Sequence, residues 1–185
     1  VSITENSYHI DNFKQILEMK NIMISGDELI TSKNPPSIEF KNVTFKYPGS
    51  DRYVFKDLSF TINSSEEIAI VGEHGAGKST LIKLICCFYY PDSGQILIDG
   101  VDSRQLNLQN WYKHLAYLTQ EFNNFSNMSL SDNVTIGDPS KTVKESEILN
   151  ALKNADAKFW LKYKNGLSTR MSQRYGGEEP SLGQW

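Results

Sequence analysis

The stretch Gly72-Glu73-His74-Gly75-Ala76-Gly77-Lys78-Ser79-Thr80 decides the fold, because it has the spacing of a glycine-rich phosphate loop. The apolar run Glu67–Val71 precedes it, and the helix-like run Leu81–Ile85 follows it. A strand, a glycine loop and a helix N-terminus in this order let backbone N–H groups converge on a phosphate, while glycines allow close approach. We therefore predict a nucleotide-binding loop in which Lys78 reaches the terminal phosphates and the Ser79 hydroxyl ligates Mg²⁺.

Length and charge exclude several other classes of protein. The chain has 185 residues, enough for one domain with a well-buried core, and its 19 basic and 22 acidic residues give a net charge of −3. No basic stripe or tail accompanies this balance, so nucleic acid is not an expected partner. No apolar run approaches the roughly 20 residues that span a bilayer, and the N-terminus has no signal pattern. We expect the chain itself to be soluble and cytosolic.

The two cysteines, Cys86 and Cys87, are adjacent within the apolar run after the phosphate loop. Neighbouring residues in a helix point to different sides, so neither cysteine is placed for a distant disulfide. We interpret both as small buried hydrophobic residues in a reducing compartment, rather than as a metal or redox site.

The order of the predicted elements indicates an α/β fold. Residues 1–34 are polar and mixed, and we expect them to form a linker before a domain over residues 35–185. Short β-like runs then predict strands, and turn residues predict the connections between them. The expected strands cover residues 38–40, 43–45, 58–62, 67–71, 95–100 and 115–119, and the expected turns cover residues 47–50 and 91–94.

From about residue 121 to residue 185 the pattern becomes helical. Thr142 to Glu145 match a capping box, and Ile148, Leu152, Ala155 and Phe159 continue one apolar face. The fold class that we predict is therefore a P-loop NTPase core with an antiparallel β-subdomain and a partial helical subdomain.

Several motifs together resemble the nucleotide-binding domain of ATP-binding-cassette (ABC) transporters, from about Ile38 to the end of the chain. They are the run from Ile38 to Pro48, the run from Phe55 to Phe60, the phosphate loop, Pro91 to Ile96, and Ile98 to Asp102. The ensemble is most similar to the exporter subfamily, in which the ATPase follows a membrane domain on the same chain. Residues 1–34 would then descend from the last membrane helix.

The resemblance implies ATP and Mg²⁺ as cofactors and gives individual residues roles. Tyr47 resembles the aromatic residue that stacks on adenine, and a strand-end aromatic side chain that caps the core is the alternative. Gln120 resembles the glutamine that touches Mg²⁺ and the attacking water, although a glutamine after a strand is usually only solvated. His74 lies at a position that varies in the family, so we expect it to face solvent.

A signature-like segment near the C-terminus departs from the family pattern. Family members carry Leu-Ser-Gly-Gly-Gln where this chain has Pro180-Ser181-Leu182-Gly183-Gln184. Ser181, Gly183 and Gln184 match the family, and in an ATP-bound dimer this segment would present its serine hydroxyl and backbone N–H groups to the γ-phosphate held by the other subunit. Leu182 adds a side chain where the backbone approaches phosphate, which should weaken that contact, whereas Pro180 is tolerated in a first helical turn.

In the family, the acidic strand that holds Mg²⁺, the catalytic glutamate and a switch histidine follow this signature, beyond Trp185. We therefore expect the chain to be C-terminally truncated, to bind nucleotide, and to hydrolyse it negligibly. The implied partners are a second nucleotide-binding domain, identical or different, and a transmembrane domain, at the cytoplasmic face of a membrane. Two alternatives stay open: a soluble ABC-type ATPase, and a non-hydrolysing nucleotide-dependent regulatory or dimerisation module.

Overall fold

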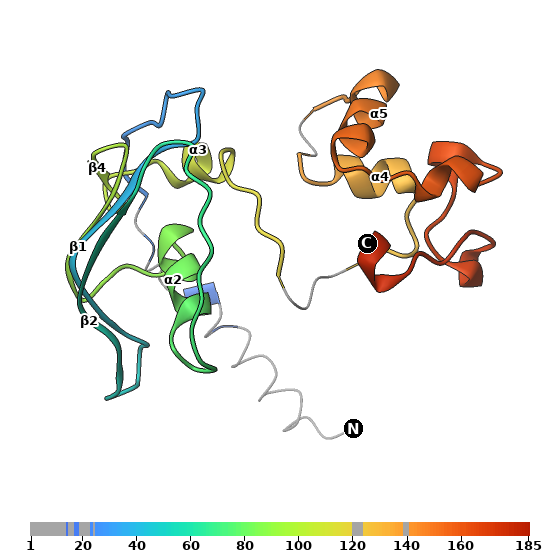
Figure 1. Ribbon diagram of the computed structural model, residues 1–185. Coiled ribbons are helices and arrows are strands. Elements are labelled where there is room, and N and C mark those ends of the chain that lie inside the picture. Colours follow the sequence, from blue (N-terminus) through green and yellow to red (C-terminus); the bar gives the residue numbers. More distant parts are fainter. Residues whose placement is uncertain (1–13, 15–16, 19–22, 24, 120–123, 139–140) are drawn as a thin grey trace. The chain divides into compact units, whose positions relative to one another are not determined.

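The computed structural model describes residues 14, 17–18, 23, 25–119, 124–138 and 141–185 (Figure 1). The chain forms two compact units, Val1–Tyr117 (unit 1) and Leu118–Trp185 (unit 2), and each is described by itself. Within the described ranges, no helix has both the length and the apolar character needed to cross a membrane.

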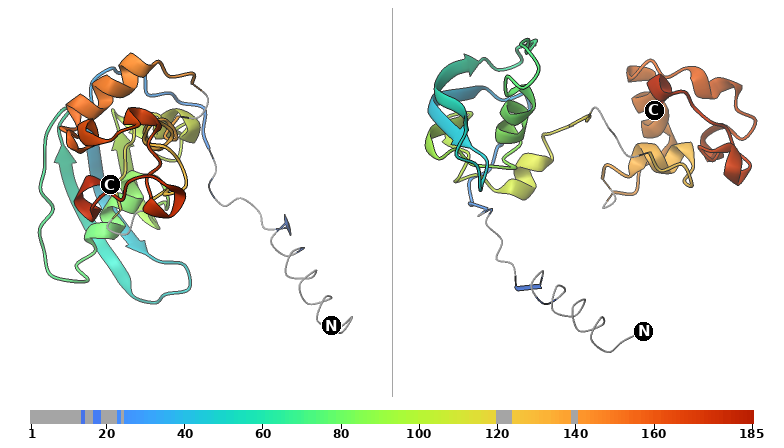
Figure 2. Two further views of the ribbon diagram at one scale, coloured as in Figure 1. Left: turned by 90° about the vertical axis from the view of Figure 1, so that its right-hand side faces the viewer. Right: turned by 90° about the horizontal axis from the view of Figure 1, so that it is seen from below.

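Unit 1 is built on a four-stranded antiparallel sheet with the strand order β2-β1-β3-β4. The strand β1 (Ile38–Lys46) pairs on one side with β2 (Tyr53–Ile62) and on the other with β3 (Ser93–Ile98). The short strand β4 (Val101–Asp102) pairs with β3. Figures 1 and 2 show the helix α2 lying against one face of this sheet.

The two strands predicted at residues 38–40 and 43–45 are one strand, β1, with a bulge between them. The pairing register shifts between Phe40 and Val43, and Asn42 has a φ of 49°. Asparagine tolerates this left-handed conformation better than most residues, and its N–H donates to the Ser59 hydroxyl at 2.8 Å. The bulge returns Val43 to the core face, so that Phe40, Val43 and Phe45 are all buried.

The helix α2 (Lys78–Ile85) closes the core of unit 1 with Leu84 and Ile85, which are buried in the same cluster as the β1 side chains. The helix α3 (Leu108–Tyr112) adds Trp111, whose indole N–H donates to the Ile85 carbonyl at 3.1 Å. A buried indole needs such a partner, so this hydrogen bond fixes the end of α2 against α3.

Cys86 and Cys87 directly follow α2, and both are free and buried, as predicted. Burial raises the pKa of the Cys87 thiol to about 12, with the neighbouring Cys86 as a second cause. The thiols therefore behave as small core side chains at neutral pH.

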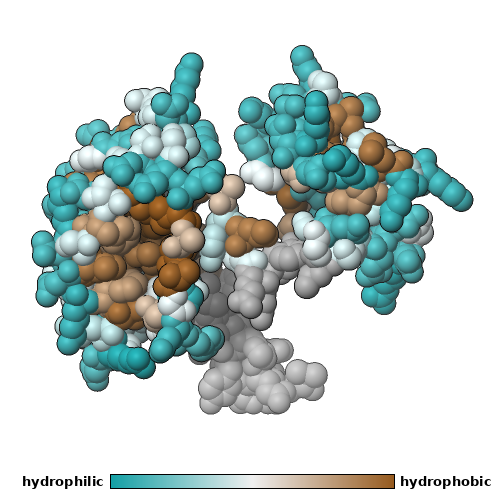
Figure 3. Space-filling model, viewed as in Figure 1, coloured by the Kyte–Doolittle hydropathy of each residue, from teal (hydrophilic) through white to brown (hydrophobic). Residues whose placement is uncertain are grey.

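The predicted strands at residues 67–71 and 115–119 are extended chain in the structure, and none of the described strands pairs with them. The side chain of Val71 is 89% exposed and that of Leu118 is 78% exposed. An apolar run becomes a strand only where its backbone groups find a neighbouring strand. Figure 3 shows apolar side chains gathered on one face of unit 1, where a cavity of about 440 Å³ is lined by Ile68, Ala69, Ile70 and Val71 among others.

The described end of the predicted linker packs on the rest of unit 1. The N–H of Gly26 donates to the Leu106 carbonyl at 2.9 Å, and the N–H of Asn107 donates to the Glu28 carbonyl at 2.8 Å. A Cβ on Gly26 would lie 2.0 Å from the Gln105 carbonyl oxygen, so the two backbones approach as only glycine allows. Ile30 is buried in the core cluster. Residues 25–30 thus contribute to this unit, and the domain boundary at residue 35 stays a prediction.

Unit 2 is helical, as the sequence pattern predicted. Its α-helices are α4 (Leu130–Thr135) and α5 (Glu145–Asn154). Four 3₁₀ turns follow: η1 (Phe159–Lys162), η2 (Gly166–Ser168), η3 (Gln173–Tyr175) and η4 (Leu182–Gln184). Their core is formed by Leu130, Ile148, Leu152, Tyr163 and Met171.

The capping box predicted at Thr142 was wrong, because α5 begins after Lys144, two residues later. The N–H of Lys144 donates to the Glu147 carboxylate at 2.9 Å. At the other end, Ala155, predicted on the apolar face, lies exposed after the helix. A capping box that the sequence reading missed precedes α4, where the Ser129 hydroxyl accepts from the Asp132 N–H at 3.1 Å.

Candidate functional site

The stretch Gly72–Thr80 connects the extended chain at residues 67–71 to the first turn of α2. Gly75 and Gly77 have φ values of +81° and +91°, which L side chains rarely adopt. At Gly77 a Cβ would also lie 2.8 Å from Val54 Cγ1 and 2.9 Å from the Phe55 ring. The glycines therefore allow the loop to turn tightly above β2 and to enter α2.

The ammonium group of Lys78 folds back over this loop. Its Nζ donates to the Gly72 carbonyl and to the Glu73 carbonyl, each at 2.7 Å. A lysine has three donors, so one N–H remains for a ligand while the other two fix the positive charge. Glu73, His74 and Ala76 are exposed on the loop surface. The arrangement places one cation above an open, glycine-containing turn.

The N-terminus of α2 adds to this positive field. Leu81 donates its N–H to the Gly77 carbonyl at 2.9 Å, so the helical hydrogen bonds begin within the glycine loop. The free N–H groups of the first turn and the helix dipole favour an anion there. Ser79 is exposed in this first turn, whereas Thr80 is buried.

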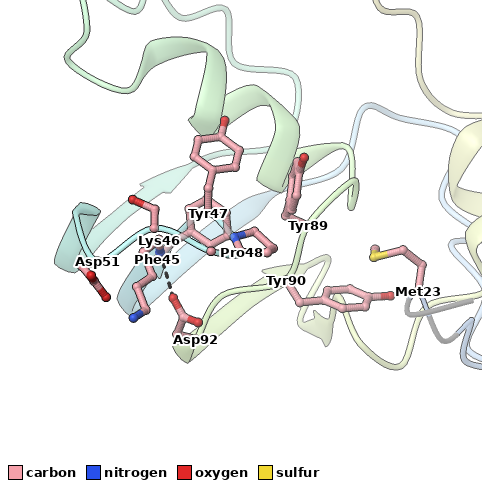
Figure 4. Close-up of a pocket in the computed structure, with 11 residues that line it drawn as sticks. Met23, Phe45, Lys46, Tyr47, Pro48, Asp51, Tyr89, Tyr90 and Asp92 are labelled. Carbon is pink, nitrogen blue, oxygen red and sulfur yellow. Dashed lines mark hydrogen bonds between the residues drawn. The ribbon is translucent and has the colours of Figure 1, made fainter. Parts of the chain in front are cut away.

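Tyr47 lies directly after β1, in the predicted turn, where the Ser50 N–H donates to the Tyr47 carbonyl at 3.0 Å. Its ring is half-buried, and its hydroxyl lies 2.9 Å from the Thr80 hydroxyl on α2. The rings of Phe45 and Tyr89 meet it edge-on, each with a centroid distance of 5.2 Å. Figure 4 shows Tyr47 and Tyr89 side by side, with the Tyr47 hydroxyl pointing towards α2.

Two separate cavities flank these groups. One of about 530 Å³ is lined by Tyr47, Tyr89, Tyr90 and neighbouring residues, and the Lys46 N–H donates to the Asp92 carboxylate at 2.8 Å on its wall (Figure 4). The apolar cavity of about 440 Å³ is lined by Ala76, Gly77 and Lys78, together with parts of β2. Among the described residues none lines both cavities, and Tyr47 contacts α2 through the Thr80 hydroxyl.

The remaining predicted site residues are not among the described residues of unit 1. Gln120 is outside the described residues. Ser181, Gly183 and Gln184 belong to unit 2, where the Ser181 N–H donates to the Gln184 side-chain carbonyl at 3.0 Å and closes a 3₁₀ turn. In the described part of the chain no group of three or more His, Cys, Asp or Glu residues could hold a metal ion.

The sequence reading did not identify Lys83 or Tyr89 as neighbours of Tyr47. The ammonium of Lys83 lies 5.5 Å from the centroid of the Tyr47 ring, and the Tyr89 ring makes a T-shaped contact with it. Both come from residues after the phosphate loop, so no local pattern around Tyr47 could have indicated them.

Comparison with known proteins identifies the family. The ABC transporter family model matches residues 55–176. The ATP-dependent lipid A-core flippase of Aromatoleum aromaticum is 48% identical over 101 residues, covering 55% of this chain and 17% of the flippase. The β-(1→2)glucan export ATP-binding/permease protein NdvA of Bartonella quintana is 33% identical over 186 residues, covering 98% of this chain and 29% of NdvA.

A solved structure agrees with these relatives. A bacterial Atm1-family ABC exporter with ATP bound superposes with a TM-score of 0.77 at 29% identity, covering 98% of this chain and 31% of the exporter chain. The chain spans less than a third of the length of each of these proteins. It has the P-loop fold of the ABC ATPases, as the sequence predicted. The chain belongs to the ABC transporter family, and it is similar to the nucleotide-binding domain of the family's exporters.

Proposed function

We propose that unit 1 binds ATP as part of a protein that exports a substrate across a membrane. The phosphates lie on Gly72–Ser79, and the adenine lies on Tyr47, whose hydroxyl contacts Thr80. The observation that carries this proposal is the position of Lys78, whose ammonium is fixed above the glycine loop by two carbonyl contacts of 2.7 Å. A charge that is already oriented at a helix N-terminus loses little conformational entropy when a triphosphate binds.

The residues present fit a nucleotide. Gly75 and Gly77 allow the backbone to approach phosphate oxygens, Lys78 offers a charged donor, and the exposed Ser79 hydroxyl in the first turn of α2 fits a Mg²⁺ ligand. Held by Ser79, Mg²⁺ would neutralise part of the charge of the phosphates. We propose Gln120 as a further Mg²⁺ ligand from its place in the family motif.

Tyr47 supplies a half-buried aromatic surface for the base. Phe45 and Tyr89 pack on this ring in T-shaped contacts, so the ring cannot rotate freely. Stacking on a fixed ring costs less entropy than stacking on a mobile one. An aromatic surface is tolerant of base identity, because every base has a π-face.

The partners follow from the family. We propose that Ser181, Gly183 and Gln184 contact the nucleotide of a second ATP-binding domain, identical or different, and that a transmembrane domain carries the substrate. The site of action would be the cytoplasmic face of a membrane. The relatives named above are exporters, which favours this function over a soluble ATPase or a regulatory module.

Isothermal calorimetry on the full 185-residue chain, with and without Mg²⁺, tests the proposal. Lys78→Ala should weaken ATP binding by about tenfold or more, since a hydrogen bond to a charged group contributes about 1.5–3 kcal/mol. Tyr47→Ala should weaken it by at least about fivefold, from the stacking energy of about 1–3 kcal/mol per base.

A matched control is Lys56→Ala, which removes the same charge from β2, where Lys56 lies over the Tyr53 ring. This variant should bind ATP as the parent chain does. Equal ATP affinity in the parent chain and in Lys78→Ala would refute the assignment of the loop.

A further inference from the structure

The Tyr47 ring contacts the same helix, α2, that begins at the phosphate loop. Thr80 lies in the first turn of α2, and its hydroxyl is 2.9 Å from the Tyr47 hydroxyl. Thr80 is only 6% exposed and Tyr47 is half-buried, so this hydrogen bond is partly shielded from water. Lys78, which begins the same helix, holds the glycine loop.

A second side chain of α2 contacts the same ring. Lys83 follows Thr80 by three residues, which places both on one side of the helix. The Lys83 ammonium lies over the Tyr47 ring, 5.5 Å from its centroid, within the range of a cation–π contact. One π-face of Tyr47 therefore faces the Lys83 ammonium of α2.

We propose that Thr80 and Lys83 are positioning residues that fix the Tyr47 ring at a set distance and angle from the phosphate loop. The inference rests on the proposed function, because it assigns Tyr47 to the base and Gly72–Ser79 to the phosphates. The phenol–threonine hydrogen bond sets the distance, and Lys83 orients the ring. Base and phosphate subsites then form one rigid body on α2, so a nucleotide meets both without a separate ordering step.

A purely structural role for Thr80 makes a different prediction. If the hydrogen bond only held the end of β1 to α2, its loss would change the binding of every phosphate ligand or of none. If it positions the ring, its loss changes only the binding of ligands that carry a base. Inorganic tripolyphosphate has the phosphate chain without the base, so it separates the two roles.

The experiment measures the affinities for ATP and for tripolyphosphate, both with Mg²⁺, by calorimetry on the full chain and its variants. Thr80→Val is nearly isosteric, removes the hydroxyl that contacts Tyr47 and keeps the backbone of the first turn. It should weaken ATP binding roughly three- to tenfold, the range for one lost hydrogen bond, with tripolyphosphate unchanged. Thr80→Ser restores the hydroxyl and should bind ATP as the parent does. Equal losses for both ligands, or no loss for ATP, would overturn the inference.

A double-mutant cycle provides the sharper test of the contact. Tyr47→Phe keeps the ring and removes its hydroxyl, so Thr80→Val should have no further effect on ATP affinity in that background. Additive losses would contradict the proposed pair. Lys83→Met keeps the aliphatic stem, and it should weaken ATP binding about two- to fivefold without affecting tripolyphosphate. If Thr80→Val does not fold, the two affinities of Lys83→Met test the inference instead.

The same data separate this inference from the proposed function. A parent chain whose ATP affinity does not respond to Lys78→Ala refutes the proposed function itself. Binding that depends on Lys78, but does not change in Thr80→Val or Lys83→Met, refutes only the positioning role.

Discussion

Gly94, near the start of β3, lies against the backbone of β1 at its bulge. A Cβ at Gly94 would lie 2.3 Å from the Asn42 carbonyl oxygen and 2.4 Å from that of Lys41. These are backbone atoms of the strand between β2 and β3, so they cannot move aside as a side-chain end can. Gly100 provides a matched control, because it has the same φ of +81° and open space around the added Cβ.

The two alanine variants should differ by the steric contribution alone. Gly100→Ala should cost about 1–2 kcal/mol of unfolding free energy, from the left-handed backbone conformation. Gly94→Ala should cost that amount plus about 1–3 kcal/mol for forcing β1 and β3 apart. We therefore expect Gly94→Ala to lose about 2–5 kcal/mol in total, enough to unfold a marginal domain.

Urea unfolding followed by tryptophan fluorescence measures this difference. Trp111 is 1% exposed in unit 1, whereas Trp160 and Trp185 pack in unit 2, so Trp160→Phe and Trp185→Phe in the background leave a probe of unit 1 alone. Equal destabilisation by Gly94→Ala and Gly100→Ala, within about 0.5 kcal/mol, would refute the reasoning about the β1–β3 register.

Three further predictions concern other parts of the chain. In the same urea assay, Ile30→Ala should destabilise unit 1 by about 2–4 kcal/mol, whereas the exposed neighbour Leu29→Ala should change it by under about 0.5 kcal/mol. Hydrogen bonds from the Ser129 hydroxyl and N–H hold the pKa of Asp132 below its usual value. The stability that this gives unit 2 is present above the unfolded pKa of about 4 and is lost as the pH falls through the lower folded pKa, so Asp132→Asn should flatten the acid limb of unfolding followed by circular dichroism. The Cys87 thiol, buried with a pKa raised to about 12, should react with iodoacetamide only after unfolding, as mass spectrometry of native and urea-treated chain would show.

The phosphate loop could be predicted from sequence because its geometry is local. Gly75 and Gly77 are the residues that need positive φ, and Lys78 starts the helix that the apolar pattern indicated. The burial of Cys86 and Cys87 was predictable for the same reason, since both continue the apolar run of α2.

Features that depend on distant segments were less predictable. The run at residues 67–71 has the composition of a buried strand, yet pairing requires a neighbouring strand, and Val71 is exposed in the structure. Ile30 lies in a segment that is polar overall, and its burial depends on hydrogen bonds to residues 105–110. The contacts of Tyr47 with Thr80 and Lys83 arise from packing of β1 on α2, which no motif encodes.

The caps of unit 2 show the limits of a short motif. Thr142 and Glu145 have capping-box spacing, but Glu147 accepts the Lys144 N–H and α5 begins after Lys144. Several polar residues in a row can each start a helix, and the start that buries Ile148 and Leu152 is the one that forms.

The most direct test of the central claim is photolabelling of the chain with an ATP analogue that carries an azide on its adenine ring, followed by mass spectrometry of the labelled peptides. The account predicts a label on the peptide that contains Tyr47, suppressed by excess ATP and lost in Lys78→Ala, because the phosphates hold the base against that ring. A label confined to unit 2, or one that neither excess ATP nor Lys78→Ala reduces, would contradict it.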